Sequence, residues 1–251
     1  MNLESGTQFP ATDELFVNAE MQVLYKVANS TIRTFPYPHI RVENVFPAEF
    51  YQQIRQHLPP TEAYKSLGEL GRIKGQYDAR RVLLLTPDSV SGLKDNCREF
   101  WDNFSRWLLG GPFSRIALHK FSPYLSSRFE NLASMQFDQE AMVIQDRTTY
   151  ALGPHTDSPS KVLSFIFYLP ADDSTPHLGT SIYLPADPTF TCAGDKHWKL
   201  PGFNRLVTMP YVPNTLFAFM KTPRSFHGVE PIKDEGIERA LLLYDIKVGT
   251  P

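Results

Sequence analysis

The sequence has few cysteines, no long apolar run and almost no net charge, and each of these absences excludes a class of protein. Cys97 and Cys192 are the only two cysteines among 251 residues, too few for a disulfide framework. No apolar run approaches the roughly 18 residues that a membrane-spanning helix needs, so we expect no membrane partner. The formal net charge is −2, and a nearly neutral chain lacks the basic surface that binds nucleic acid.

Sequence motifs of several common enzyme classes are also missing. There is no G-x-S-x-G of a serine hydrolase. There is no phosphate-binding G-x-x-x-x-G-K-[ST] and no dinucleotide-binding G-x-G-x-x-G. Residues 1–6 have neither the basic start nor the apolar core of a signal peptide. We therefore expect a cytoplasmic protein, and the missing motifs suggest neither a nucleotide nor a dinucleotide ligand.

The chain divides into two portions with different hydrophobic periodicity, and we expect both to belong to one domain of residues 1–251. Residues 1–135 are mainly helical in pattern. Apolar residues recur at helical spacing in 88–109, which Gly110 and Gly111 end. Further helices are expected at 13–28, 48–58 and 112–121, and a strand at 80–85.

Residues 136–251 instead contain short runs rich in β-branched and aromatic residues, bounded by Pro, Gly, Asn and Asp. The expected strands are 141–145, 162–169, 180–184, 206–209, 215–220 and 240–248. No crossover helices separate them, which favours an antiparallel sandwich or barrel over a parallel sheet. The segment 185–205 is long for a loop, and loops of this length are often functional lids. The sequence predicts a mainly β fold with flanking helices.

The first candidate for chemistry is His155-Thr156-Asp157, just before the expected strand 162–169. Alternate residues of an extended segment point to the same side, so the imidazole and the carboxylate can face one ion. A His-x-acid pattern is short and occurs by chance, and a surface histidine beside a carboxylate is the simpler interpretation.

His227, in the run Ser225-Phe226-His227-Gly228-Val229, completes a possible set of two histidines and one carboxylate. Such a set holds iron in non-haem oxygenases and leaves further coordination positions open. Structural zinc sites normally close with four ligands and prefer cysteine. Arg239, at the start of the expected strand 240–248, has the guanidinium geometry to bind a carboxylate through two nitrogens.

On these residues the sequence resembles the Fe(II)/2-oxoglutarate-dependent oxygenases. The resemblance covers roughly residues 140–248 and follows the order of that superfamily, with His155 and Asp157 first, His227 next and Arg239 last. The run from His155 to Pro170 is similar to the corresponding strand of the prolyl-hydroxylase-like branch. In that branch a tyrosine at the place of Tyr168 binds the distal carboxylate of 2-oxoglutarate.

The resemblance implies a double-stranded β-helix, or jelly-roll, core with an N-terminal helical layer. It implies Fe(II) held by His155, Asp157 and His227, with 2-oxoglutarate and O₂ as co-substrates and Arg239 with Tyr168 on the distal carboxylate. Halogenating members have a small residue in place of Asp157. A carboxylate here therefore implies hydroxylation, or another oxidation, of a C–H bond in an amino acid, a sugar or a natural-product intermediate.

Three cations near the expected site, Arg147, Lys161 and Arg224, are candidates for substrate binding. Arg80 and Arg81 alternate faces if they lie on a strand, so at most one of them points into a cavity. Two alternatives stay open. One is a non-catalytic, cupin-like binding module, because a fold does not fix a function. The other is an iron oxygenase of the same fold that does not use 2-oxoglutarate.

Overall fold

A computed structural model describes residues 11–73 and 78–249, so the segment considered as a signal peptide lies outside the described residues. The α-helices are α1 (Ala11–Asn29), α2 (Ala48–Gln56), α3 (Pro87–Ser91), α4 (Asp95–Leu108) and α5 (Pro112–Leu125). The strands are β1 (His39–Glu43), β2 (Lys65–Ser66), β3 (Arg80–Leu84), β4 (Phe137–Arg147), β5 (Leu152–His155), β6 (Lys161–Tyr168), β7 (Thr180–Pro185), β8 (Phe203–Met209), β9 (Thr215–Met220), β10 (His227–Val229) and β11 (Glu238–Val248). No described helix has the combination of length and apolar character needed to cross a bilayer.

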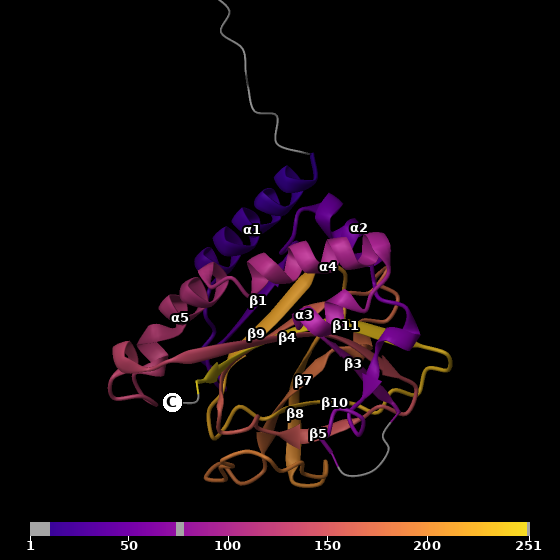
Figure 1. The fold of residues 1–251 in the computed structure, drawn as a ribbon. Coiled ribbons are helices and arrows are strands. Elements are labelled where there is room, and N and C mark those ends of the chain that lie inside the picture. The colour runs from indigo at the N-terminus through magenta and orange to yellow at the C-terminus, as the bar shows by residue number, and fades with distance from the viewer. Residues whose placement is uncertain (1–10, 74–77, 250–251) are drawn as a thin grey trace, which may run out of the picture.

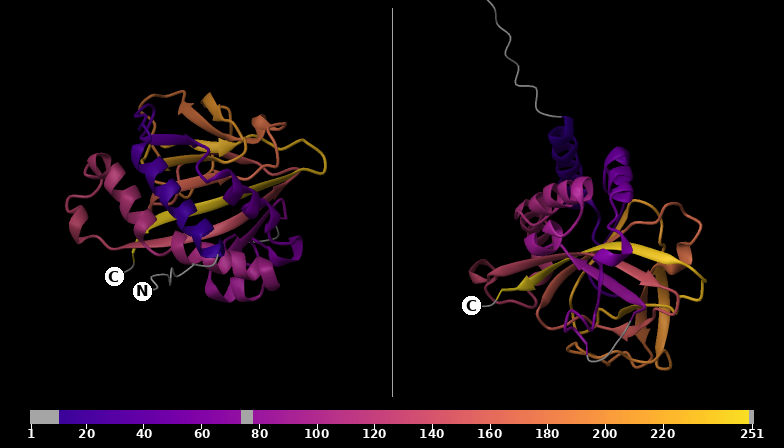
Figure 2. Two further views of the ribbon diagram at one scale, coloured as in Figure 1. Left: turned by 90° about the horizontal axis from the view of Figure 1, so that it is seen from above. Right: turned by 45° about the vertical axis from the view of Figure 1, so that its right-hand side comes forward.

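The strands form two antiparallel sheets that face each other. The larger sheet has the order β1-β9-β6-β11-β4-β3-β2, and the smaller one has the order β5-β10-β7-β8. Helices cover the outer face of the larger sheet, and the smaller sheet lies on its other side (Figure 1). Two further views show the same layers (Figure 2). The expected mainly β fold with a jelly-roll core and a helical layer is confirmed.

Side-chain alternation divides the large sheet into a helix-facing side and an inner side. On β6, Phe165 and Phe167 belong to the core under the helices, whereas Ile166 and Tyr168 belong to the core between the sheets. The same period of two acts on the neighbouring strands. It places a group of buried polar side chains on the inner side: Asp146, Ser164, Arg239 and Asp245.

Aromatic side chains pack the helical layer against the large sheet. Trp101 and Phe104 of α4 and Phe113 of α5 are fully buried. The ring of Phe113 lies 5.0 Å from that of Phe165, centroid to centroid. Burying each large apolar side chain contributes about 1.5–3 kcal/mol. This layer therefore supports the sheet that holds the polar residues.

Two expectations for the N-terminal portion need correction. The expected single helix over 88–109 is two helices, because α3 ends at Gly92 and α4 begins only after Lys94. Thr86 starts α3 by accepting a hydrogen bond from the backbone N–H of Ser89. The portion also contains β1, a strand that was not expected, although His39–Glu43 alternates between polar and apolar residues. Both β1 and β3 are strands of the large sheet, so the N-terminal portion builds part of the jelly roll.

Candidate metal centre

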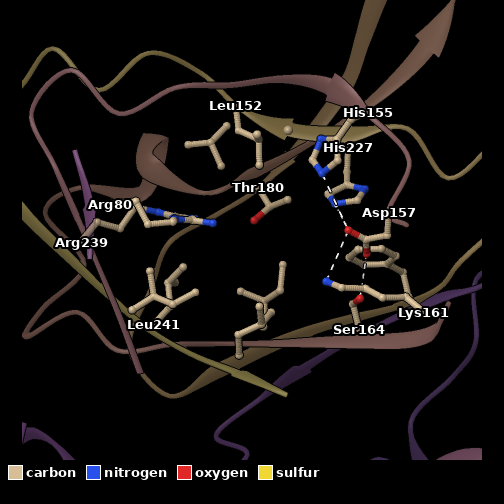
Figure 3. Close-up of a pocket in the computed structure, with 16 residues that line it drawn as sticks. Arg80, Leu152, His155, Asp157, Lys161, Ser164, Thr180, His227, Arg239 and Leu241 are labelled. Atoms are coloured by element: carbon tan, nitrogen blue, oxygen red, sulfur yellow. Dashed lines mark hydrogen bonds and ion pairs between the residues drawn. The ribbon is translucent and has the colours of Figure 1, made fainter. Parts of the chain in front are cut away.

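Two short strands of the small sheet bring the candidate histidines together. His155 ends β5 and His227 begins β10, and the two residues are direct partners across the antiparallel pair. Asp157 lies two residues beyond β5. Its Oδ1 is 3.8 Å from Nε2 of each histidine. One ligand atom from each of the three side chains lies within 4.8 Å of the others, an arrangement that can hold a metal ion (Figure 3).

Backbone carbonyls orient both imidazoles. Nδ1 of His155 is 3.1 Å from the carbonyl oxygen of Gly153, and Nδ1 of His227 is 2.9 Å from that of Ser225. A neutral imidazole that donates from Nδ1 has its lone pair on Nε2, the atom that faces Asp157. Ser164 donates a hydrogen bond of 2.8 Å to Oδ2 of Asp157. This leaves Oδ1 as the oxygen that faces both histidines.

Burial and neighbouring charge favour the metal-binding protonation states. Burial, followed by the nearby His227, lowers the pKa of His155 well below 6.5. Burial also lowers the pKa of His227. The pKa of Asp157 is lowered because Lys161 and the two histidines outweigh the opposing effect of burial. Neutral imidazoles and a charged carboxylate are the forms in which these side chains bind metals.

Lys161, one of the three cations expected near the site, is in direct contact with a candidate metal ligand. Its Nζ is 3.4 Å from Oδ1 of Asp157 and 2.9 Å from Oδ2 of Asp245. Burial lowers the pKa of Lys161, but the two carboxylates outweigh burial and raise it. The ammonium group therefore stays charged between two acids at the inner wall of the site.

A cavity of about 110 Å³ extends from the three candidate ligands to two arginines. Figure 3 shows the histidines and Asp157 at one end and the guanidinium groups of Arg80 and Arg239 at the other. The remaining wall is largely apolar and includes Leu152 and Leu241. A cavity of this form suits a small, elongated molecule with an anionic group at its far end.

Arg239 reaches the cavity from the second residue of β11 and is fully buried. Its Nη1 donates to Oδ2 of Asp146 at 2.6 Å, and its Nε donates to the carbonyl of Leu178. Its Nη2 is buried and has no hydrogen-bond partner in the described part of the chain. A buried donor without a partner is costly, and a ligand carboxylate at this end of the cavity would satisfy it.

Tyr168 lies behind the cavity wall. Its hydroxyl accepts a hydrogen bond of 3.1 Å from the backbone N–H of Thr180, and Thr180 lines the cavity whereas Tyr168 does not. Burial raises the pKa of Tyr168 and outweighs the opposing effect of Arg239, so the phenol stays protonated. Its contact with a co-substrate stays a prediction.

The other two expected substrate-binding cations do not line this cavity. Arg147 is the last residue of β4, and its Nη2 lies 3.7 Å from Oε1 of Glu238. Arg224 is exposed and donates to the carbonyl of Pro188. Of the three cations, the structure brings only Lys161 to the candidate metal centre, and substrate binding by Arg147 or Arg224 stays a prediction.

Two residues, one at each end of the cavity, had no expected role. Arg80 is the one of the Arg80–Arg81 pair that lines the cavity, and the alternation of strand residues was the signal that could have found it. His197 forms a β-bridge with His155, and the two ring centroids lie 4.9 Å apart. No spacing rule identifies His197, because it lies in the long segment between β7 and β8.

That long segment folds against β5. The backbone N–H of Trp198 donates to the carbonyl of Pro154 at 2.8 Å. A Cβ atom on Gly153 would lie 2.2 Å from the carbonyl oxygen of Trp198, so only glycine fits here. The segment thus lies next to His155, and its role as a lid stays a prediction.

Comparison with known proteins identifies the fold. No protein-family model matches the sequence, and no curated protein sequence matches it either. Among solved structures, a prolyl-4-hydroxylase from Pseudomonas putida superposes with a TM-score of 0.51 at 15% identity, over 91% of this chain and 100% of that chain. A 2OG-Fe(II) oxygenase family oxidoreductase from Burkholderia pseudomallei superposes with a TM-score of 0.50 at 11% identity, over 89% of each chain.

A third similar structure is the α-ketoglutarate-dependent epimerase SnoN from nogalamycin biosynthesis. It superposes with a TM-score of 0.50 at 12% identity, over 92% of this chain and 84% of that chain. At such identities the likeness establishes the fold alone. This chain therefore folds as 2-oxoglutarate-dependent iron oxygenases do.

Proposed function

We propose that the protein is an Fe(II)- and 2-oxoglutarate-dependent oxygenase that hydroxylates a C–H bond of a small molecule. One observation carries the proposal. One cavity has a His-Asp-His set at one end and, at the other, a buried arginine with a nitrogen that has no hydrogen-bond partner among the described residues. Those two ends match the two ends of 2-oxoglutarate. Its 2-oxo acid group can chelate a metal ion, and its distal carboxylate can bind an arginine.

The donor set fits iron better than structural zinc. His155, Asp157 and His227 provide three ligand atoms, and three ligands leave an octahedral ion with open positions. Structural zinc normally requires four protein ligands. When bound, iron with 2-oxoglutarate and O₂ supplies the oxidising chemistry that no side chain of this protein can supply.

The side chains of the cavity bind the co-substrate, orient the metal ligands and exclude water. Arg239 binds the distal carboxylate of the co-substrate in a buried site where a charge-assisted hydrogen bond is strong. Ser164 and Lys161 hold Asp157 so that one carboxylate oxygen faces the metal position. The apolar part of the wall, which includes Leu152 and Leu241, offers no group that would compete for either end of the co-substrate.

The substrate class that we propose is a small molecule such as an amino acid, a sugar or a natural-product intermediate. SnoN, with a similar fold, is an epimerase of nogalamycin biosynthesis. The Pseudomonas putida relative in fold is a prolyl-4-hydroxylase. Asp157 keeps the carboxylate that halogenating members of the superfamily lack, so we propose hydroxylation or another oxidation and not halogenation.

Metal binding and co-substrate consumption test the proposal. Under anaerobic conditions, calorimetric titration with Fe(II) should show one site in the wild-type protein, and His227→Ala should abolish it. His197→Ala is the matched control, since it removes a neighbouring histidine that lies outside the three candidate ligands. With O₂ and Fe(II) present, the wild type should convert 2-oxoglutarate to succinate.

Other results would favour a non-catalytic binding module or an iron oxygenase that does not use 2-oxoglutarate, or would reject the metal centre. A protein that binds Fe(II) at His227 but neither binds nor consumes 2-oxoglutarate is not a 2-oxoglutarate-dependent oxygenase. Substrate-dependent O₂ consumption without 2-oxoglutarate would then identify the co-substrate-independent oxygenase. Iron binding that survives His227→Ala would reject the assigned metal centre.

A further inference from the structure

We propose that Arg80 is a second co-substrate-binding residue. In this proposal, Asp146 holds Arg80 and Arg239 together as one clamp for the distal carboxylate of 2-oxoglutarate. We call Arg80, Asp146 and Arg239 the arginine clamp. The inference rests on the proposed function and extends it to a residue from the N-terminal portion, outside the region of family resemblance.

The register of the large sheet aligns the three residues in one row. Asp146 on β4 is the direct cross-strand partner of Arg80 on β3 and also of Arg239 on β11. Directly opposed side chains on one face of a sheet lie close enough to interact. The side chains of both arginines face the cavity between the sheets, whereas Arg81, the next residue along β3, does not line it.

Hydrogen bonds to one carboxylate fix both guanidinium groups. Nε and Nη2 of Arg80 donate to Oδ1 and Oδ2 of Asp146, at 2.6 and 2.8 Å. Nη1 of Arg239 donates to the same Oδ2 at 2.6 Å. Arg80 also lies over the ring of Tyr150, 4.2 Å from its centroid. Two arginines held in this way are already oriented before a ligand binds, which lowers the entropic cost of binding.

Among the described residues, the charges at this end of the cavity do not balance. The guanidinium groups of Arg80, whose side chain is 16% exposed, and of Arg239, 1% exposed, share the single carboxylate of Asp146. The one carboxylate among the described residues that line the cavity is Asp157, which already faces Lys161. A buried excess positive charge is costly unless an anion compensates it. One ligand carboxylate between Arg80 and Arg239 would compensate it and would also reach the unpartnered Nη2 of Arg239.

The test separates the distal carboxylate from the metal-chelating end of the co-substrate. Protein loaded with Ni(II), which does not support turnover, is titrated calorimetrically with 2-oxoglutarate and with pyruvate. Pyruvate keeps the 2-oxo acid but has no distal carboxylate. Arg80→Gln should weaken 2-oxoglutarate binding about 10- to 100-fold, as expected for a lost hydrogen bond to a charged group, and should leave pyruvate binding unchanged.

Arg81→Gln is the matched control on the same strand and should change neither affinity. Arg80→Lys keeps the charge but loses the two-nitrogen geometry, so it should weaken 2-oxoglutarate binding by a smaller factor. Unchanged Ni(II) and pyruvate binding shows that each variant is folded. If Arg80→Gln does not fold, Arg80→Lys decides, and wild-type affinity for 2-oxoglutarate in that variant overturns the inference.

The outcomes distinguish this inference from the proposed function. A wild-type preference for 2-oxoglutarate over pyruvate that persists in Arg80→Gln overturns the role of Arg80 and leaves the proposed function intact. A wild-type protein that binds both compounds equally contradicts the proposed function itself. Equal weakening of both compounds in Arg80→Gln would mean that Arg80 acts on the metal end and not on the distal carboxylate.

Discussion

His155 and His227 are direct cross-strand partners, and their ring centroids lie 4.2 Å apart. The register of β5 and β10 therefore brings together two residues that are distant in sequence. The backbone carbonyls that bind Nδ1 of each ring belong to the same two chain segments. A metal centre built in this way depends on the pairing of two short strands.

Gly228→Ala should therefore disturb the metal centre without touching a ligand. A Cβ atom on Gly228 would lie 2.4 Å from the carbonyl oxygen of Leu152, on the facing strand. We expect a loss of about 1–3 kcal/mol in the free energy of unfolding and weaker Fe(II) binding, measured by chemical denaturation and anaerobic calorimetry. Gly92→Ala is the control, because its Cβ would meet nothing closer than 3.5 Å. Unchanged Fe(II) affinity in folded Gly228→Ala would contradict this account.

Lys161 should contribute to stability through the two acids that it joins. Lys161→Met leaves the buried carboxylates of Asp157 and Asp245 without their shared cation. We expect the metal-free protein to lose about 3–5 kcal/mol of unfolding free energy, the usual cost of breaking a buried ion pair. Adding Asp245→Asn to that variant should recover part of the loss. Additive effects in this double-mutant cycle would show that the two residues are not coupled.

Glu140 provides a pH-dependent test of the sheet next to the site. It binds Arg72 at 2.6 Å and Lys247 of β11 at 2.7 Å. Burial raises the pKa of Glu140, but these two cations outweigh burial and hold it below 4.5. A lowered folded-state pKa stabilises the protein above the unfolded-state value, and this stabilisation is lost as pH falls through the folded-state value.

Glu140→Gln should therefore cost about 1 kcal/mol near neutral pH, and the difference from wild type should shrink as the pH falls below about 4.5. Urea unfolding at a series of pH values measures it. Asp138→Asn, which removes an exposed carboxylate of the same strand, should show no such trend. A difference for Glu140→Gln that is independent of pH would contradict the assigned ion pairs.

The sequence predicted the long strands of the jelly roll well, because their period is strong. The run 162–169 and the run 240–248 correspond to β6 and β11 with shifts of one or two residues. The strands β5 and β10 were not predicted. Each is short and contains glycine, and β5 also contains Pro154, so neither carries the composition that marks a strand. β5 is stabilised by pairing with β10, and β10 pairs with β7 on its other side.

The residues of the candidate site also fall into those that the sequence predicted and those that it did not. The order of His155, Asp157, His227 and Arg239 indicated that these residues come together, and the structure places all four around one cavity. Strand alternation indicated that at most one of Arg80 and Arg81 could face a cavity, but it did not identify this cavity. The position of Arg80 depends on β3 joining the sheet beside β4, a long-range pairing that no local pattern specifies. The inward position of Lys161 depends in turn on Asp245, far away in sequence on β11.

The central claim is that one cavity binds Fe(II) at its histidine end and 2-oxoglutarate across its length. Anaerobic visible absorption spectroscopy of the purified protein with Fe(II) and 2-oxoglutarate tests it most directly, because the chelate has a metal-to-ligand charge-transfer band. We expect this band in the wild type and a weaker band, at the same co-substrate concentration, in Arg239→Gln. Absence of the band in a wild-type protein that demonstrably binds Fe(II) would contradict it.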